Sequence, residues 1–171
     1  EQSKRCLVYG GGPWSVEIAQ YLNRFGSQVW VVTQEDSVLH DESKAIRSRL
    51  AKALQIQGIN TISGAKGLGL KKKSSGVLAS MTVKDKEQSL QVDLVIAIRR
   101  TAAVKDLGLE TVGLDVKPGF IQVNERMETG VKGLYAIGDL PGPEKKHSPH
   151  AASSAGLVAA ENAMGVNRVF D

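Results

Sequence analysis

The chain has 171 residues, 42% of them hydrophobic and 23% charged, with a formal net charge of +4 at pH 7. These values suit one globular domain, or one domain and a piece of another. They disfavour a nucleic-acid-binding protein, because only 5% of the residues are aromatic and the basic residues are scattered apart from two short lysine runs.

The single cysteine, Cys6, excludes a disulfide-stapled secreted module. No apolar run reaches membrane-spanning length, and no signal-peptide pattern is present. We therefore expect no membrane or nucleic-acid partner and a cytoplasmic location, with the mitochondrial matrix and plastid left open. The three histidines lack ligand spacing, so we expect no metal site.

The segment from Cys6 to Thr33 predicts a strand, a glycine turn, a helix and a second strand. An apolar run ends at Gly10, and Pro13 suits the first helical position because its fixed φ is helical. Four apolar residues follow at helical spacing, Gly26 suits the end of the helix, and 29–32 is a second buried run. This is the first half of a dinucleotide-binding fold.

The glycine turn predicts a phosphate site. Gly10 allows the tight bend, Gly12 lets the backbone approach a pyrophosphate, and the start of the helix attracts the anion. Ser15 replaces the third glycine of the G-x-G-x-x-G pattern and is small enough for close contact between helix and strand. A tight turn without a ligand is the alternative, and we favour phosphate binding.

The end of the second strand bears on the choice of cofactor. Thr33 stands where an acidic residue would bind the ribose hydroxyls, Gln34 follows it, and Glu35 and Asp36 lie out of register. No arginine occupies 33–39, which weakens the case for a 2′-phosphate. We expect NAD, with NADP left open, and expect Thr33 or Gln34 to contact the ribose.

The middle of the chain predicts a helix and a β-meander. Asp41 is a suitable N-cap for a helix that ends at Gly58, and a short strand follows. Nearly alternating segments at 66–72, 77–83 and 89–92 predict an antiparallel meander, and the apolar run 93–98 predicts a buried parallel strand.

The last third has a looser pattern. We expect short strands at 120–123 and 133–139 and a helix at 150–164. The predicted fold is α/β, a Rossmann-like parallel sheet with helices on one face and an antiparallel β-meander on the other. The predicted domains are 1–100, a connecting segment 101–132, and a strand and helix in 133–171.

The order of these motifs resembles the flavin-dependent pyridine nucleotide–disulfide oxidoreductases, most nearly the dihydrolipoyl dehydrogenases. The resemblance rests on an ordered series of segments that covers nearly the whole chain: 10–17, 93–98, 107–113, 119–123, 127–129, 133–139, 150–152 and 159–162.

The resemblance implies that 1–100 is an NAD(P)-binding domain and that 133–171 is the returning part of an FAD-binding domain. It implies an oxidoreductase in which hydride passes between nicotinamide and FAD. Glu17 matches a glutamate beside the nicotinamide, Asp139 matches an acidic residue that contacts the flavin, and Arg99 stands where the family has glycine.

The redox-active cysteine pair of that family is absent, because Cys6 is the only cysteine. Together with a first residue that is not methionine, this suggests a fragment. Its expected partners are a nicotinamide dinucleotide and the rest of the flavoenzyme or its dimer mate. We expect it to bind no FAD alone and to hold no catalytic residue.

Ordinary structural roles compete with several of these assignments. Glu17 could equally be a solvated carboxylate in the first turn of a helix, and Asp139 could belong to a plain turn. Trp14 is expected to pack on the helix face, and its place beside the glycines makes it a fluorescent reporter of binding. Arg99 suits either a phosphate contact or a solvated charge. The second hypothesis for the whole chain is a non-catalytic Rossmann-like module that has lost tight nucleotide binding, and Ser15, Thr33 and Arg99 favour it.

Overall fold

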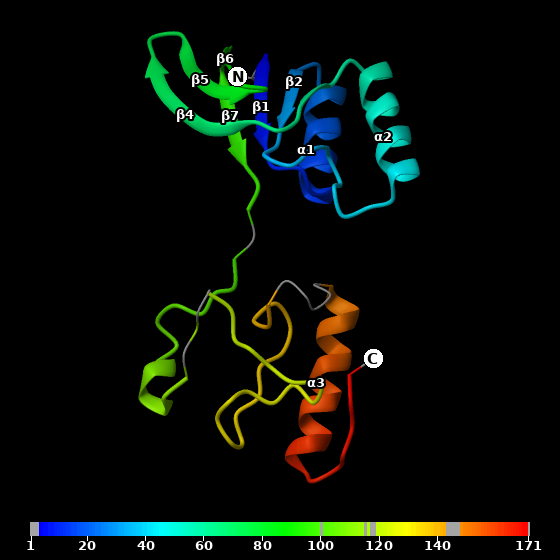
Figure 1. Cartoon of the computed structure of the whole chain (residues 1–171), viewed down its shortest axis with the longest axis vertical. Coiled ribbons are helices and arrows are strands. Elements are labelled where there is room, and N and C mark those ends of the chain that lie inside the picture. Colours follow the sequence, from blue (N-terminus) through cyan, green and yellow to red (C-terminus); the bar gives the residue numbers. More distant parts are fainter. Residues whose placement is uncertain (1–3, 100, 115, 117–118, 143–147, 171) are drawn as a thin grey trace. The chain divides into compact units, whose positions relative to one another are not determined.

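The structure is a computed structural model that describes residues 4–99, 101–114, 116, 119–142 and 148–170 (Figure 1). The chain divides into two compact units, Glu1–Arg99 and Arg100–Asp171. We describe each unit by itself. None of the helices in the described ranges has the length and apolar character needed to cross a membrane.

Unit 1 is built around a four-stranded parallel sheet with the strand order β3-β2-β1-β7. Its strands are β1 (Arg5–Tyr9), β2 (Gln28–Val32), β3 (Asn60–Ile62) and β7 (Leu94–Ala97). The central strand β1 pairs with β2 from Arg5↔Gln28 to Tyr9↔Val32. Its apolar core, Cys6–Val8, is fully buried because layers cover both faces of the sheet.

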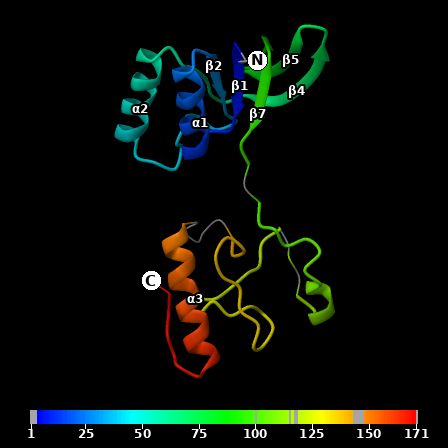
Figure 2. The same ribbon diagram turned by 180° about the vertical axis from the view of Figure 1, so that it is seen from behind.

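Two helices cover one face of this sheet (Figures 1 and 2). They are α1 (Pro13–Arg24) and α2 (Lys44–Ile56). The helix α1 begins at Pro13, as predicted, and Gly26 follows its last turn with a φ of +85°. A cluster of buried residues joins strands and helices: Cys6, Val8, Val29, Val31, Val16, Ala19 and Leu54.

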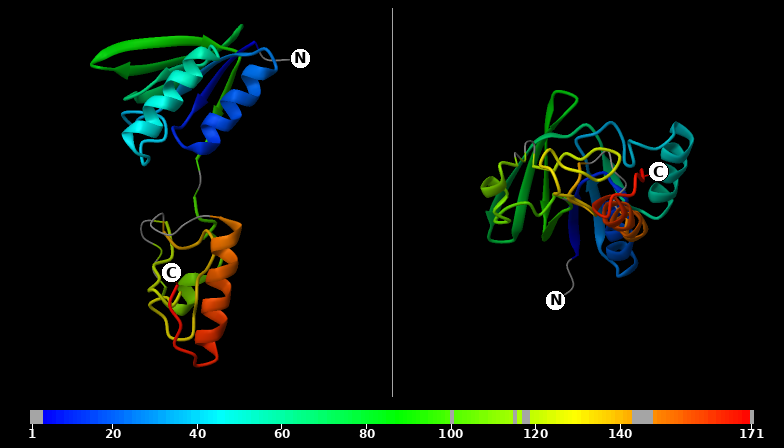
Figure 3. Two further views of the ribbon diagram at one scale, coloured as in Figure 1. Left: turned by 90° about the vertical axis from the view of Figure 1, so that its right-hand side faces the viewer. Right: turned by 90° about the horizontal axis from the view of Figure 1, so that it is seen from below.

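An antiparallel meander covers the other face, and Figure 3 shows these layers from two further directions. Its strands are β4 (Lys66–Lys73), β5 (Gly76–Val83) and β6 (Lys86–Val92). Leu7 and Val32, whose neighbours along each strand face the helices, pack against Ala79 and Met81 of β5. The predicted α/β fold, with helices on one face and a meander on the other, is confirmed.

The start of α2 differs from the prediction. Ser43, and not Asp41, is the N-cap, and its hydroxyl accepts a hydrogen bond from the Ile46 peptide N–H at 3.4 Å. The Asp41 carboxylate lies instead 3.0 Å from the His40 ring. A serine two residues nearer the helix satisfies the same orphan N–H groups, so the sequence pattern did not separate the two candidates.

Unit 2 contains a short 3-10 helix, η1 (Leu109–Val112), and the predicted C-terminal helix, α3 (Pro149–Ala163). The prediction of strands at 120–123 and 133–139 is wrong. Among the described residues of this part of the chain, the only β-bridge is an isolated one between Glu128 and Tyr135. An apolar run becomes a strand only where a neighbouring strand accepts its peptide groups. The 133–139 segment instead packs as loop beside Met127, with Ala136 N–H donating to the Met127 carbonyl at 3.1 Å.

Candidate functional site

The turn between β1 and α1 needs glycine at its first position. Gly10 has a φ of +137°, and a Cβ there would lie 2.9 Å from the Ile98 carbonyl oxygen. The Gly10 N–H donates to the Val32 carbonyl at 2.8 Å, which ties the turn to the end of β2. Only a residue without a side chain can occupy this place between two neighbouring strands.

Gly11 is also sterically required, although the G-x-G-x-x-G pattern treats this position as variable. A Cβ on Gly11 would lie 2.6 Å from the Thr33 hydroxyl oxygen. The only signal in the sequence was that the glycines form a triplet. The restriction comes from β2, which brings Thr33 against the turn.

Gly12 is the N-cap of α1 and has space around it. Its φ is −79°, no side-chain cap satisfies the helix start, and a Cβ there would meet nothing within 4 Å. Among the described residues, none accepts a hydrogen bond from the peptide N–H of Gly11 or Gly12. Free N–H groups at the positive end of a helix dipole favour an anion.

Ser15 lies beneath the turn and is 1% exposed. Its hydroxyl oxygen would be 2.7 Å from a Cβ on Gly10, so the helix and the strand end are in close contact at this point. Within the described part of the chain the hydroxyl has no hydrogen-bond partner. A buried hydroxyl in that state costs about 1–3 kcal/mol.

A cleft of about 680 Å³ opens at the carboxyl ends of β1, β2 and β7 and is lined by 9–12, 33–35, 40–41 and 97–99. In open parallel sheets this edge is where ligands bind. Gly10, Gly12, Thr33, Gln34 and Arg99 therefore come together around one cleft, although they are far apart in the sequence.

Thr33 and Gln34 have different surroundings. Thr33 is 2% exposed, and its hydroxyl accepts a hydrogen bond from the Glu35 peptide N–H at 3.2 Å. Gln34 and Glu35 are exposed and line the cleft. Thr33 therefore supports the turn from below, while the two residues after it present polar groups to the cleft.

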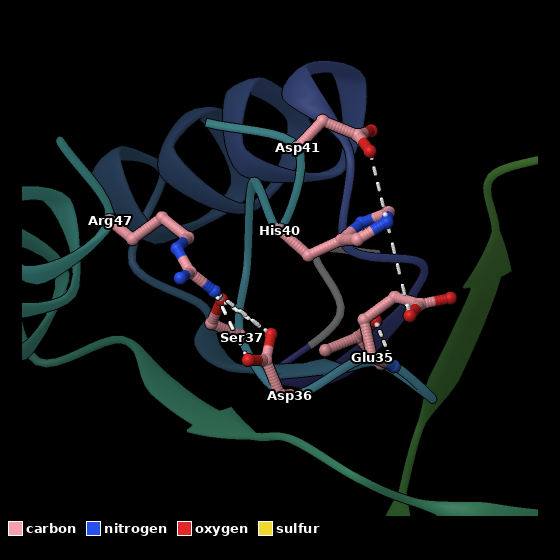
Figure 4. Close-up of polar contacts among 7 residues, drawn as sticks. Glu35, Asp36, Ser37, His40, Asp41 and Arg47 are labelled. Carbon is pink, nitrogen blue, oxygen red and sulfur yellow. Dashed lines mark hydrogen bonds and ion pairs between the residues drawn. The ribbon is translucent and has the colours of Figure 1, made fainter. Parts of the chain in front are cut away.

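The loop after β2 adds residues that the sequence interpretation did not assign to the site (Figure 4). The His40 Nε2 lies 3.0 Å from an Asp41 carboxylate oxygen and 4.0 Å from a Glu35 carboxylate oxygen. Nothing in the spacing of this loop predicted that these three residues would share the cleft with the glycines.

Asp36 points away from this group. Its carboxylate accepts hydrogen bonds from the Ser37 hydroxyl at 3.1 Å and from the Arg47 guanidinium at 3.0 and 3.1 Å. The hydrogen bond from Ser37, and then the one from Arg47, lower the pKa of Asp36 below its usual value. This carboxylate is thereby committed to α2 rather than to the cleft.

Of the other predicted site residues, Arg99 lines the cleft, whereas Pro13, Trp14, Glu17 and Asp139 do not. Pro13, Trp14 and Glu17 belong to the first turns of α1; Trp14 is 55% exposed, and Glu17 lines a separate groove along the helix. Asp139 lies in an exposed turn of unit 2. Arg99 is exposed in the cleft, just beyond the end of β7.

Comparisons with known proteins agree with this architecture. The chain is 40% identical over 172 residues to the dihydrolipoyl dehydrogenase of Thermus scotoductus, covering 98% of this chain and 37% of that protein. It is 32% identical over 170 residues to a dihydrolipoyl dehydrogenase of Bacillus subtilis, covering 98% of this chain and 35% of that protein. The chain thus spans little more than a third of the length of these relatives.

Two solved structures share the fold. LpdA from Mycobacterium tuberculosis superposes with a TM-score of 0.86 at 24% identity, covering 100% of this chain and 37% of that one. The HOCl-induced flavoprotein disulfide reductase RclA from Escherichia coli has a TM-score of 0.82 at 24% identity, covering 100% of this chain and 39% of that one. Residues 1–159 match the pyridine nucleotide-disulphide oxidoreductase family. The chain therefore belongs to that family.

Proposed function

We propose that this chain binds a nicotinamide dinucleotide, NAD(H), across the glycine turn, as the nucleotide-binding part of a flavoenzyme resembling dihydrolipoyl dehydrogenase. In such an enzyme the nicotinamide exchanges hydride with FAD, and the protein contributes binding and orientation. The likeness to two dihydrolipoyl dehydrogenases and the cleft at the carboxyl edge of the sheet support this proposal.

The observation that carries the proposal is the open start of α1. The space beside Gly12, with nothing within 4 Å of a Cβ there, admits a group that binds close to the backbone. The peptide N–H groups of Gly11 and Gly12 would donate to a pyrophosphate, and the helix dipole would favour its charge. The buried, unpartnered Ser15 hydroxyl below is a second polar group that a ligand or a water could satisfy.

Other residues have narrower roles in this proposal. Gln34, exposed in the cleft, is better placed than the buried Thr33 to contact a ribose. Arg99 supplies a cation near the phosphates. The roles of Glu17 beside the nicotinamide and of Asp139 beside FAD stay predictions, as do the assignments of 1–100 and 133–171 to NAD- and FAD-binding domains.

A second candidate function is a module that keeps the fold without tight nucleotide binding. Two observations favour it. The residue at the end of β2 is the buried Thr33 instead of a carboxylate, and the bulky Arg99 lines the cleft where the resemblance implies glycine.

Titration of the purified chain with NADH and NADPH distinguishes the two candidates. Tryptophan emission from Trp14 and Trp30 and the emission of NADH itself report binding. We expect saturation with a Kd between micromolar and submillimolar, and no flavin absorbance in the purified chain. A folded chain that responds to neither dinucleotide up to millimolar concentration would support the second candidate.

A pair of glycine variants localises the binding. Gly12→Val keeps an allowed φ, and its Cβ would meet nothing within 4 Å, so it should fold, but its side chain fills the space beside the backbone. We expect it to weaken NADH binding by about ten-fold or more, equivalent to about 1.4 kcal/mol. Gly130→Val is the matched control, because a Cβ there also meets nothing within 4 Å and Gly130 does not line the cleft. Equal binding by both variants would show that the turn is not the site.

A further inference from the structure

We propose that two copies of this chain associate through one exposed side of α1, with their α1 helices antiparallel. Trp14, Tyr21 and Phe25 make up this side, and we call them the aromatic face of α1. None of the three lines the cleft at the glycine turn, so the proposal does not rest on nucleotide binding.

The aromatic face carries all the exposed aromatic side chains of the described residues. Trp14 is 55% exposed and Tyr21 and Phe25 are each 58% exposed, whereas the other aromatic residues are half-buried. Spacings of seven and four residues place the three within about 40° of one another around the helix. The rings of Tyr21 and Phe25 lie with their centroids 4.7 Å apart. Exposed apolar patches on soluble proteins mark sites of interaction.

The opposite side of α1 holds the helix on the sheet. Val16 and Ala19 lie on that side and are buried in the cluster that joins α1 to β1 and β2. The aromatic face is therefore turned away from the sheet. A partner can cover it without disturbing the packing of α1 in unit 1.

The charges beside the aromatic face are self-complementary. Glu17 and Arg24 are exposed and form no ion pair among the described residues. They are two helical turns apart, about 10.5 Å along the axis. In an antiparallel pair of α1 helices the order of residues is reversed, so each Glu17 lies beside the partner's Arg24. An alignment shifted by only about 3 Å places Trp14 beside the partner's Phe25, and the long charged side chains span that difference.

A groove beside the aromatic face provides space for a ring of the second copy. Its volume is about 380 Å³, and its apolar lining includes Tyr21 together with Leu39 and Leu50. Glu17 and Arg24 line the same groove, so its border carries one acidic and one basic residue. A border of a single sign would favour a partner of opposite charge. The mixed border fits a second α1, which presents the same aromatic and charged groups in reverse order.

The available area indicates a weak dimer. An aromatic side chain buries about 150–250 Å² when fully covered, so three half-exposed rings from each copy would bury roughly 500–700 Å² in total. The ion pairs and the groove extend this area toward about 1,200 Å², the lower end of the range for specific interfaces. Because association also has an entropic cost, we expect a dimer Kd of about 10–100 µM.

Analytical ultracentrifugation of the purified chain from about 2 to about 500 µM measures this association. Tyr21→Gln removes the central ring but keeps a good helix former, and it should raise the dimer Kd by about ten-fold or more. Ile56→Gln is the matched control, because Ile56 is an exposed apolar residue at the end of α2 that does not line the groove. It should associate as the native chain does. A native chain that stays monomeric throughout, or equal association by the two variants, would overturn the proposal.

An exchange of charges tests the antiparallel arrangement. Glu17→Lys and Arg24→Glu each place like charges side by side across the interface, so each should raise the dimer Kd by about three- to five-fold. The double variant Glu17→Lys/Arg24→Glu restores opposite charges and should return the Kd to within about two-fold of the native value. In a parallel pair each residue would meet its own counterpart, and the exchange would restore nothing. A double variant that associates as weakly as the single variants, while folded by circular dichroism, would therefore overturn the antiparallel pairing.

Discussion

The side chain of Thr33 fills the space directly against Gly11. A Cβ on Gly11 would lie 2.6 Å from the Thr33 hydroxyl oxygen and 3.1 Å from the Thr33 Cβ. The same hydroxyl accepts a hydrogen bond from the Glu35 N–H, so it cannot rotate away without breaking that bond. The residue at the end of β2 therefore couples the glycine turn to the loop that lines the cleft.

This contact predicts coupled effects of mutation. Gly11→Ala should lower the free energy of unfolding by about 1–3 kcal/mol, because the methyl group overpacks the turn. Thr33→Ala should cost about 1 kcal/mol through the lost hydrogen bond. The double variant should lose less free energy of unfolding than the sum of the two single losses. The difference should be about 0.5 kcal/mol or more, measured by urea unfolding. Additive losses would contradict the contact.

The unpartnered hydroxyl of Ser15 predicts an unusual result for a buried polar residue. Ser15→Ala removes a hydroxyl that is unsatisfied within the described part of the chain, so the free energy of unfolding should stay unchanged or rise by up to about 1 kcal/mol. Ser43→Ala, at the N-cap of α2, is the control and should cost about 1 kcal/mol. A loss at Ser15 as large as that at Ser43 would show that the Ser15 hydroxyl has a partner.

The ion pair between Arg5 and Asp93 predicts a pH-dependent contribution to stability. The Arg5 guanidinium lies 2.6 Å from the Asp93 carboxylate, and its hydrogen bond lowers the pKa of Asp93 below the usual value. The stabilisation is present above the unfolded pKa, about 3.9, and is lost as the pH falls through the lower folded pKa.

Asp93→Asn should therefore melt at a lower temperature than the native chain at neutral pH, and the difference should disappear near about pH 2. Glu87→Gln should not show this pattern, because Glu87 has no ion pair among the described residues. A difference for Asp93→Asn that persists in acid would indicate that the ionised carboxylate is not the cause.

The exposed Arg99 at the cleft predicts an electrostatic contribution to binding. Arg99→Ala should weaken NADH binding by about three- to ten-fold and reduce its dependence on salt, because a cation near the phosphates is lost. Arg49→Ala, on the exposed surface of α2, is the control and should bind as the native chain does. Tighter binding by Arg99→Ala would mean that the side chain obstructs the cleft, in favour of the second candidate function.

Most of the fold of unit 1 could be predicted because its signals are local. The apolar runs before Gly10 and at 93–98 predicted strands, and both form strands of the parallel sheet. The prediction that the second of them is buried is wrong, because β7 lies at the edge of the sheet and none of its residues Leu94–Ala97 is buried. The alternation at 77–83 likewise predicted β5. The equally apolar 133–139 did not form a strand, because strand formation depends on a neighbour that a local pattern cannot supply.

The sequence by itself determined the strand, the glycine turn and the helix that begins at Pro13, since these depend on backbone preferences of adjacent residues. Only the tertiary structure decided that Gly11 must be glycine, that Thr33 is buried, and that Glu35 and His40 share a cleft with Arg99. Those relationships arise because parallel pairing brings the ends of β1, β2 and β7 to one edge of the sheet, and the residues that meet there are distant along the chain.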